Sequence, residues 1–474
     1  MADNPIISTA KQSQGFSITI YNQNFAVVRE QRQLSLNQGT NLVRYEDVAA
    51  QIDPTSISFK SVTAPNSVMV REQNYQYDLL NPTTILNKSV GKTIRFRRVN
   101  PDGQIEILEG TLLNPPEVTV ASQNSYRGSN QSQKLVIRLP NGNVVLNPSG
   151  EMELNEMPEG LVSRPSLLWK LEVSEAGDHA TEVSYIANAI TWKVDYVAVV
   201  SEDESKVDIT GWVTLDNRSG ATYENSQLQL IAGDVRRVEE SQQAQVMMLK
   251  SVKARSAQPQ FEEETFFEYH LYTLDGTTTV KNNETKQMTL LSVAEVEVHR
   301  KLIFDSNKNW YYSRRNCPDQ GEDSHQDKVN VILEFANTKT NNMGMPLPKG
   351  KVRVYKADRR GNLQFLGEDL IDHTPRDEVV GLYIGDSFDV VGDRKRTAHK
   401  QISNTVTEES LEIFIRNRKE DQAQVWVVER FSGDWKILKT SHSYNQVDAK
   451  TLEFPITINP GEEVKITYSV RIKH

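Results

Sequence analysis

The segment Ile190–Asp234 constrains the fold of this chain more than any other. It contains three runs in which apolar and polar residues alternate, VDYVAVV, VDITGWVTL and QLQLIAG, and polar turns rich in Asn, Gly and Ser separate them. Alternation with a period of two is typical of strands that bury one face. The segment therefore predicts three or four consecutive strands of a sheet. Trp192 shares its strand phase with Val194, so we expect its side chain to be buried.

Similar runs cover most of the chain and predict a mainly β protein with several β-sandwich or barrel domains. At 474 residues the chain is too long for one core. Short strands joined by PDG and PNGN turns indicate a small barrel, and regularly spaced strands near the end indicate a sandwich. We expect an N-terminal β domain (1–89), an SH3-like barrel insert (90–154), a central β-sandwich region (155–400) and a C-terminal immunoglobulin-like sandwich (401–474).

A polar tract near 235–264 interrupts the central region. Its content of Gln, Ser and charged residues predicts a linker or a hairpin arm. Its apolar residues follow a helical period only loosely, so it is the one candidate helix of the sequence.

Several segments of the chain occur together in a known family. The runs ITWKVDY, VTLDNRSGA and LQLIAGD are followed in order by FEYHLYTLDGTTTVKNNETKQMTLL, MGMPLPKGKVRVYKAD, LEIFIRNRK and FPITINPGEEVKITYSVRI. Together they resemble the domain-of-unknown-function family shared with mucoidy inhibitor A proteins, over most of the chain from Leu161 to His474. The resemblance implies a bacterial protein with an envelope- or surface-related role and no assigned mechanism. Mucoidy inhibitor A proteins carry an N-terminal coiled coil, and no sustained heptad appears in this sequence.

Charge and hydropathy restrict the partners and the compartment. A net charge of -9 argues against nucleic acid, because binding phosphates requires clustered excess Lys and Arg. The short basic run RKRTAHK, from Arg394, is expected to be a solvated loop. No apolar run is long enough for a transmembrane segment. The N-terminal residues lack a signal-peptide pattern, which predicts a cytoplasmic protein as the chain is written, or a periplasmic or extracellular one if a signal peptide was removed.

One segment invites a hydrolase interpretation. Gly385, Asp386 and Ser387 follow the apolar run VVGLYI and are similar to the nucleophile block of a serine esterase family. Catalysis would need a histidine base and an acidic partner, but neither His399 nor His442 occurs in a D-x-x-H segment. A strand followed by an Asp-Ser turn is the simpler explanation. Ser387 remains the nucleophile of the alternative in which the protein hydrolyses a polysaccharide or an ester.

A phosphate loop is suggested by the glycines of GMPLPKGK, residues 344–351. The spacing has one residue too many, and Val352 stands where Ser or Thr should bind magnesium. Two prolines also remove backbone donors. We therefore predict a structural loop before the strand KVRVY.

Two groups of residues are considered as metal ligands. Glu295, Glu297 and His299 alternate along one strand, but side chains on one face are spaced by about 7 Å, too far apart for one ion, which predicts a solvated face. A second group offers oxygen ligands to calcium but lacks the order of a known calcium loop. Its members are Asp319, Glu322, Asp323 and Asp327. No other cofactor is expected.

Exposed aromatic residues supply the binding hypothesis. Trp310, Tyr311 and Tyr312 lie in a polar context next to Arg314, which is typical of a partner or ligand surface, and a glycan could stack on the same rings. The same residues could instead cap the open end of a sandwich. Edge strands of β domains also pair with other chains. We therefore expect a non-enzymatic binding or assembly module with a protein partner or a homo-oligomer; the alternatives are the hydrolase and a cation-stabilised structural envelope protein.

Three strands end in asparagine, at Asn217, Asn337 and Asn417, and each is followed by a polar turn. Asparagine tolerates left-handed backbone and bonds its own main chain. Turn chemistry repeated in similar sandwiches is the expected explanation.

Overall fold

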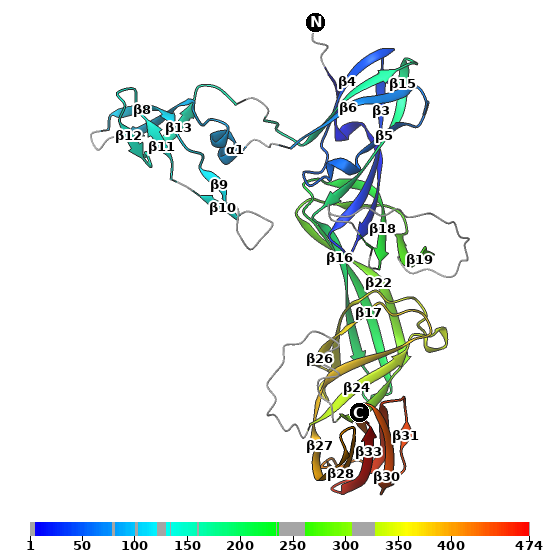
Figure 1. Ribbon diagram of the computed structural model, residues 1–474. Coiled ribbons are helices and arrows are strands. Elements are labelled where there is room, and N and C mark those ends of the chain that lie inside the picture. Colours follow the sequence, from blue (N-terminus) through cyan, green and yellow to red (C-terminus); the bar gives the residue numbers. More distant parts are fainter. Residues whose placement is uncertain are drawn as a thin grey trace.

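The computed structural model describes residues 5–77, 81–99, 103–120, 129–132, 134–158, 161–233, 235–236, 261–305 and 328–473. Its regular structure is almost entirely strand, which confirms the mainly β prediction. Within these ranges the helices are α1 (Pro82–Asn87) and the 3-10 turns η1 (Ala10–Gln12), η2 (Pro54–Ser56) and η3 (Lys339–Asn341). The molecule is elongated, with the N-terminal sheets at one end, the C-terminal sheet at the other and the insert to one side (Figure 1).

Two sheets form the N-terminal end. The larger has the order β19-β20-β18-β2-β3-β15-β5, with β21 paired to β18, and the smaller has the order β1-β4-β14-β6. The larger contains β2 (Ser13–Tyr21), β3 (Phe25–Leu36), β5 (Ser58–Ser61), β15 (Gly177–Asn188), β18 (Tyr223–Ala232), β19 (Phe261–Phe266), β20 (Tyr269–Leu274) and β21 (Thr278–Val280). The smaller contains β1 (Ile6–Ser8), β4 (Gly39–Glu46), β6 (Val68–Gln76) and β14 (Ser166–Val173). Strands that follow the insert therefore complete sheets begun before it.

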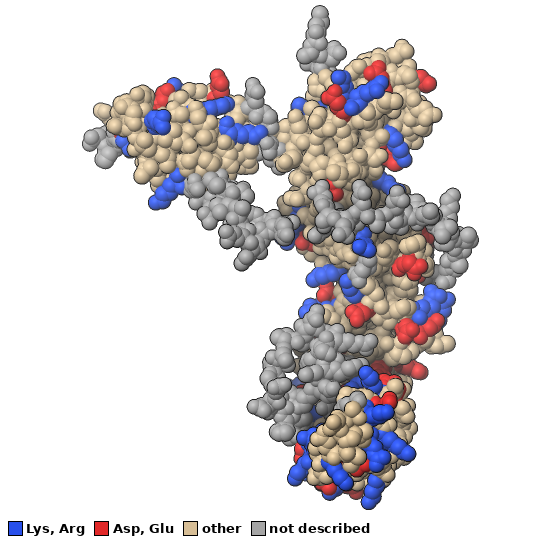
Figure 2. Space-filling view, in the orientation of Figure 1, with Lys and Arg blue, Asp and Glu red and all other residues tan. Residues whose placement is uncertain are grey.

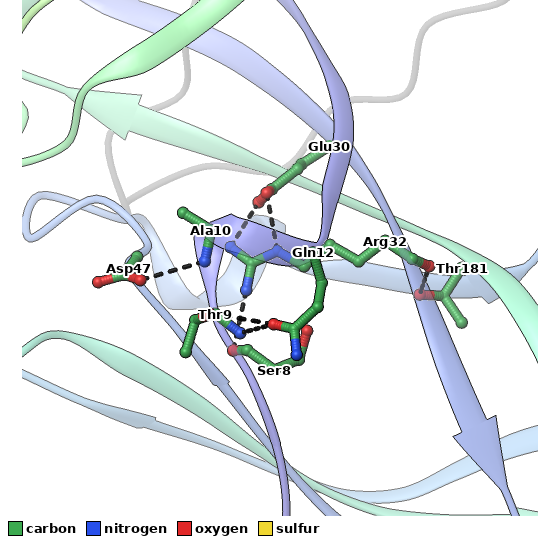
Figure 3. Close-up of polar contacts among 8 residues, drawn as sticks. All are labelled: Ser8, Thr9, Ala10, Gln12, Glu30, Arg32, Asp47 and Thr181. Atoms are coloured by element: carbon green, nitrogen blue, oxygen red, sulfur yellow. Dashed lines mark hydrogen bonds and ion pairs between the residues drawn. The ribbon is translucent and has the colours of Figure 1, made fainter.

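A buried ion pair anchors the first strand of this end (Figure 3). Arg32 and Glu30 are 0% and 1% exposed, and Nε of Arg32 lies 2.7 Å from Oε1 of Glu30. Burial raises the pKa of Glu30, and the hydrogen bonds from Arg32 oppose that rise. The guanidinium also donates to the Ser8 carbonyl oxygen at 2.9 Å and lies 3.6 Å from the centre of the Tyr45 ring. The pair therefore ties β1 to the sheet.

The insert is a five-stranded sheet of order β12-β11-β8-β7-β13. Its strands are β7 (Thr93–Val99), β8 (Ile105–Leu112), β11 (Val136–Arg138), β12 (Val144–Leu146) and β13 (Glu151–Leu154). A separate ribbon pairs β9 (Glu117–Val120) with β10 (Ser129–Ser132). The small core includes Leu86 from α1, Phe96 and Ile137. In the described part of the insert the two edge strands do not pair, so the sheet is open where the sequence suggested an SH3-like barrel.

The central sheet contains the segment from which the prediction began. Its order is β22-β17-β16-β25-β26, with β16 (Ile190–Val200), β17 (Lys206–Asn217), β22 (Glu284–Glu297), β25 (Gly350–Ala357) and β26 (Leu363–Ile371). Trp192 is 2% exposed, as predicted, and its Nε1 donates to the Ile231 carbonyl oxygen at 3.2 Å. One cluster of buried side chains extends from Phe16 to Leu382, so the central and N-terminal sheets share a core. Of the tract near 235–264, residues 237–260 lie outside the described ranges.

The C-terminal sheet has nine strands in the order β30-β33-β28-β27-β24-β23-β29-β32-β31 and surrounds a second core in a sandwich-like arrangement. They are β23 (His299–Asp305), β24 (Lys328–Ala336), β27 (Val379–Ser403), β28 (Val406–Asn417), β29 (Ala423–Arg430), β30 (Asp434–Thr440), β31 (Asn445–Gln446), β32 (Thr451–Ile458) and β33 (Glu463–Lys473). The expected boundary at 401 lies inside β27. Both β27 and β24 pass from one core into the other: Leu382 and Leu333 belong to the first, Val390 and Val329 to the second.

The basic run from Arg394 is a strand and not the predicted loop, because it forms the C-terminal half of β27. Carboxylates on β28 lie opposite its cations: Glu409 Oε1 is 2.9 Å from Arg396 Nη1 and 3.0 Å from His399 Nδ1. Opposite charges across a strand pair stabilise it. Figure 2 accordingly shows basic and acidic side chains interspersed over this end of the molecule. The basic run by itself suggested a loop because the carboxylates that neutralise it belong to another strand.

Candidate binding site

Both groups of site residues predicted from the sequence lie outside the described residues. They are the aromatic group Trp310, Tyr311, Tyr312 and Arg314 and the calcium group Asp319, Glu322, Asp323 and Asp327. The two hypotheses stay predictions. In the part of the chain that is described, no three His, Cys, Asp or Glu side chains are grouped so as to hold a metal ion. No helix in that part is long and apolar enough to cross a membrane.

Two other sequence candidates are structural, as predicted. Glu295, Glu297 and His299 are exposed while the valines between them are buried, so they form a solvated face. The loop that resembled a phosphate site is fixed to the core by tyrosines: the Pro346 carbonyl oxygen accepts from Tyr272 at 3.0 Å, and the Pro348 carbonyl oxygen accepts from Tyr196 at 2.8 Å.

A cleft of about 280 Å³ lies where the central sheet meets the C-terminal sheet. Strand ends and turns of β16, β25 and β26 contribute from one side, and β23, β24 and β27 contribute from the other. Its wall is largely apolar and includes Val200, Leu302, Val331, Leu333, Leu366 and Ile384. Since β24 and β27 belong to both cores, the two sides of the cleft are connected by continuous strands.

A bulge in β27 forms the rim of this cleft. Asp386 pairs with Asn330 and Val391 pairs with Lys328, so residues 387–390 stand opposite Val329 alone. Bulges of this kind turn a side chain away from its regular direction. The side chain turned outward here is Phe388, which is 94% exposed.

Hydrogen bonds on both sides fix the bulge. The Ser387 hydroxyl oxygen accepts from the Val390 backbone N–H at 3.1 Å, and the Asp389 carbonyl oxygen accepts from the Arg418 N–H at 2.7 Å. Before the bulge, the Asp386 carboxylate accepts from the Asn330 amide at 2.8 Å and lies 3.0 Å from Lys328 Nζ. Phe388 is therefore held outward by a fixed backbone.

Ser387, the nucleophile of the hydrolase alternative, lies in this bulge. His399 Nδ1 contacts Glu409, and His442 Nδ1 contacts Ser441. Neither histidine belongs to the described lining of the cleft. The sequence drew attention to the right segment for a different reason, because the residues that resembled a nucleophile block are the start of the bulge.

Glu204 brings two cations together on the central side of the cleft. It occupies a turn with φ 60°, and its carboxylate contacts Nη1 of Arg300 and lies 2.8 Å from Nζ of Lys356. Burial raises the pKa of Glu204, but the Lys356 hydrogen bond and the charge of Arg300 outweigh it and hold that pKa below its usual value. Glu204 is therefore ionised at neutral pH. In the same turn, hydrogen bonds from Ser201 and Ser205 lower the pKa of Asp203 to about 2.

Lys419 is the third cation of the cleft, and its backbone is fixed. Its N–H donates at 3.0 Å to Oδ1 of Asn417, which is fully buried. In the described part of the chain its ammonium makes no hydrogen bond and no ion pair. Burial lowers the pKa of Lys419, and the charge of Arg300 lowers it further, whereas Glu204, Asp389 and Asp421 oppose the shift. Glu204 and Asp389 thus act on Lys419 as opposite charges within the cleft, without a direct ion pair in the described part of the chain.

The chain matches no protein-family model and no curated protein. The cleft itself combines a fixed exposed aromatic ring, a largely apolar wall, and three cations with three carboxylates among its described lining residues.

Proposed function

We propose that this protein is a non-enzymatic binding or assembly module whose ligand is another protein. The observation that carries the proposal is Phe388, 94% exposed on a hydrogen-bonded bulge beside an apolar cleft. A large aromatic side chain held in water costs free energy unless a partner covers it, and aromatic anchors next to pockets dominate protein interfaces. A fixed bulge also lowers the entropy that binding would cost.

The neighbouring edge strand supports association. β26 forms a strand ladder only with β25 among the described strands, and part of its other edge lies against β27, where the Asp369 carboxylate accepts from the Tyr383 N–H at 2.7 Å. Leu363, Phe365 and Leu370 on this strand are more than half exposed. Exposed apolar side chains grouped on one strand favour contact with a partner protein.

We also propose membership of the domain-of-unknown-function family shared with mucoidy inhibitor A proteins, and with it an envelope- or surface-related role. The quoted segments fall mainly on β16, β17, β18, β22, β25, β28, β32 and β33, and they include Asn417 and Lys419. The resemblance therefore includes strands of both sheets beside the cleft and, of the described lining residues, Lys356 and Lys419.

Photo-crosslinking from the cleft tests the function. Benzoylphenylalanine replaces Phe388 in one variant and Lys439, an exposed residue of β30, in the control. We expect position 388 to trap one protein reproducibly in the native cells, and Phe388→Ser to abolish co-purification of that same protein. If 388 and 439 give the same products, and Ser387→Ala abolishes hydrolysis of a generic ester or glycoside, the hydrolase replaces the module.

A further inference from the structure

The central sheet turns one face to the shared core and the other to solvent. Along β16 and β17, Val194 and Val213 are buried in that core, whereas Trp212 is 38% exposed. Asp195 pairs directly with Trp212, and residues that pair across two strands share a face. Arg353 of β25 reaches the same carboxylate, with its Nη1 at 3.6 Å from Oδ1. Trp212, Asp195 and Arg353 therefore lie side by side on the solvent face.

Trp212 differs from the other described tryptophans because its ring has no partner. The indole N–H groups of Trp169, Trp192 and Trp435 each donate to an oxygen, at 2.9, 3.2 and 2.8 Å. The ring of Trp426 lies 5.8 Å from a lysine ammonium. Within the described ranges, Trp212 makes no hydrogen bond, ring contact or cation contact. An aromatic ring in water with an unused N–H is suited to contact with a ligand.

The polar groups beside Trp212 retain hydrogen-bonding capacity. The Asp195 side chain is 16% exposed, and its shortest contacts are 3.4 Å to the Thr214 hydroxyl and 3.6 Å to Arg353. Nε of Arg353 also lies 3.4 Å from Glu368. These contacts are longer than the range of about 2.7–2.9 Å that is typical of charge-assisted hydrogen bonds. An acceptor and a donor are therefore both available to a ligand.

Charge on this face selects no ion. The Asp195 carboxylate is opposed by Arg353, and the Glu368 carboxylate lies 2.9 Å from Nζ of Lys351. Lys193 also lies 3.7 Å from Asp195, but its side chain is 69% exposed and screened by water. A fitting ligand is uncharged, has an apolar face, and both donates and accepts hydrogen bonds. A sugar ring has these properties, because its C–H groups lie on the ring faces and its hydroxyls on the rim.

We propose that the solvent face of the central sheet binds a neutral oligosaccharide. A sugar ring stacks on the indole of Trp212, and its hydroxyls donate to Asp195 and accept from Arg353. None of these three residues lines the cleft, so the inference goes beyond the proposed function and assigns the protein a second ligand at a separate site.

Isothermal titration calorimetry of the full chain tests the inference. The probes are neutral hexasaccharides of glucose, galactose, mannose, xylose or N-acetylglucosamine. We expect at least one to bind, and Trp212→Leu and Arg353→Met each to weaken its binding at least about tenfold. Trp212→Phe keeps an aromatic ring and should lose less than Trp212→Leu. Trp426→Leu is the matched control and should leave binding unchanged.

Arg353→Met leaves the Trp212 ring in place, so it tests the site even where Trp212→Leu lowers stability. The inference is overturned if no neutral hexasaccharide binds at millimolar concentration, or if binding survives either variant. Tighter binding of inorganic sulfate or oligogalacturonate would also overturn it, because the face would then be an anion site. If crosslinking from position 388 still traps one protein while every glycan fails, the proposed function stands and only this inference is wrong.

Discussion

In both the central and the C-terminal sheet, a buried asparagine stands at the end of a strand pair and makes the same set of hydrogen bonds. In the central sheet Ile190 of β16 pairs with Asn217, and in the C-terminal sheet Val390 of β27 pairs with Asn417. Each asparagine is fully buried, and its amide donates to the carbonyl oxygen four residues on and to two consecutive carbonyls of a distant strand end. Those acceptors are Ala221, Val280 and Lys281 for one, and Asp421, Ile458 and Asn459 for the other.

The two sites differ in the residue whose N–H each asparagine oxygen accepts. In the central sheet it is Ser219, which is fully buried and bonds the Tyr223 hydroxyl at 3.0 Å. In the C-terminal sheet it is Lys419, which lines the cleft. The same backbone arrangement thus completes a core in one sheet and presents a cation in the other, as expected when a site is built on an existing fold.

A second difference concerns the strand partner of each pair. Trp192 of β16 fills the first core, and the residue in the corresponding register of β27 is Gly392. A Cβ on Gly392 would lie 2.4 Å from the Phe304 ring. Trp192 fills its core from β16 itself, whereas the corresponding space beside β27 is filled by Phe304 from β23.

The largest expected effect in this comparison follows from removing Trp192. Trp192→Ala should lower the free energy of unfolding by roughly 3–5 kcal/mol through lost burial and an unfilled cavity. Urea denaturation followed by circular dichroism measures the change. A variant that melts like the parent would contradict the buried position and return Trp192 to the ligand-binding candidates.

Asn217→Ala and Asn417→Ala come next and test whether the two devices are equivalent. Each leaves buried carbonyl and N–H groups unpaired, so we expect each to cost roughly 2–4 kcal/mol. Native-state hydrogen exchange should show loss of protection around β18 and β21 for the first and around β29 and β32 for the second. A small loss in only one of them would show that the shared geometry does not carry the same energy.

The sequence predicted which segments form strands better than it predicted which side chains bond distant segments. Period-two alternation is local, so strand content and the burial of Trp192 could be read directly. Asn217, Asn337 and Asn417 are recognisable as strand ends. None of them has a positive φ, but the predicted bonds to the local main chain occur at Asn217 and Asn417, whose Oδ1 atoms accept from the N–H two residues on. All three side chains are buried and bond several backbone groups. Asn337 bonds Gly344, Met345 and Pro375, a set of partners that differs in spacing from those of Asn217 and Asn417. The further acceptors of Asn217 and Asn417 lie on distant strand ends, and turn propensity carries no information about those.

The cleft was missed for the same reason. Arg300, Lys356 and Lys419 are far apart in sequence, and nothing local indicates that they surround Glu204. The one available signal was the tripeptide Gly385–Ser387, where a strand is interrupted. The sequence predicted a strand followed by an Asp-Ser turn, whereas β27 continues through a bulge at this point, and that distinction depends on its pairing with β24.

A third prediction tests whether Phe304 fills the space in the second core that Trp192 fills in the first. Gly392→Ala would place a methyl group against the Phe304 ring, and overpacking of this kind typically costs about 1–3 kcal/mol. We expect a lower unfolding midpoint, and partial recovery in the double variant Gly392→Ala with Phe304→Leu. If Gly392→Ala is neutral by itself, Phe304 does not occupy the space that Trp192 fills in the other sheet.

The smallest expected effect is the change in the free energy of unfolding when Lys419 is replaced. The sign of that change distinguishes a binding residue from a structural one. Because the folded pKa of Lys419 is below the usual lysine value, the unfolded chain binds more protons between those two values, and this residue makes stability rise as the pH rises through that window. Lys419→Met should remove that rise.

At neutral pH, Lys419→Met should leave the free energy of unfolding within about 0.5 kcal/mol of the parent or raise it, because the cost of burying the ammonium is removed and no ion pair among the described residues is lost. Urea midpoints at neutral pH and near the lysine pKa measure both effects, with Lys439→Met as the control for losing a lysine. A clear destabilisation at neutral pH would mean that Lys419 supports the fold as Ser219 does. The difference between the two asparagine sites would then have no functional meaning.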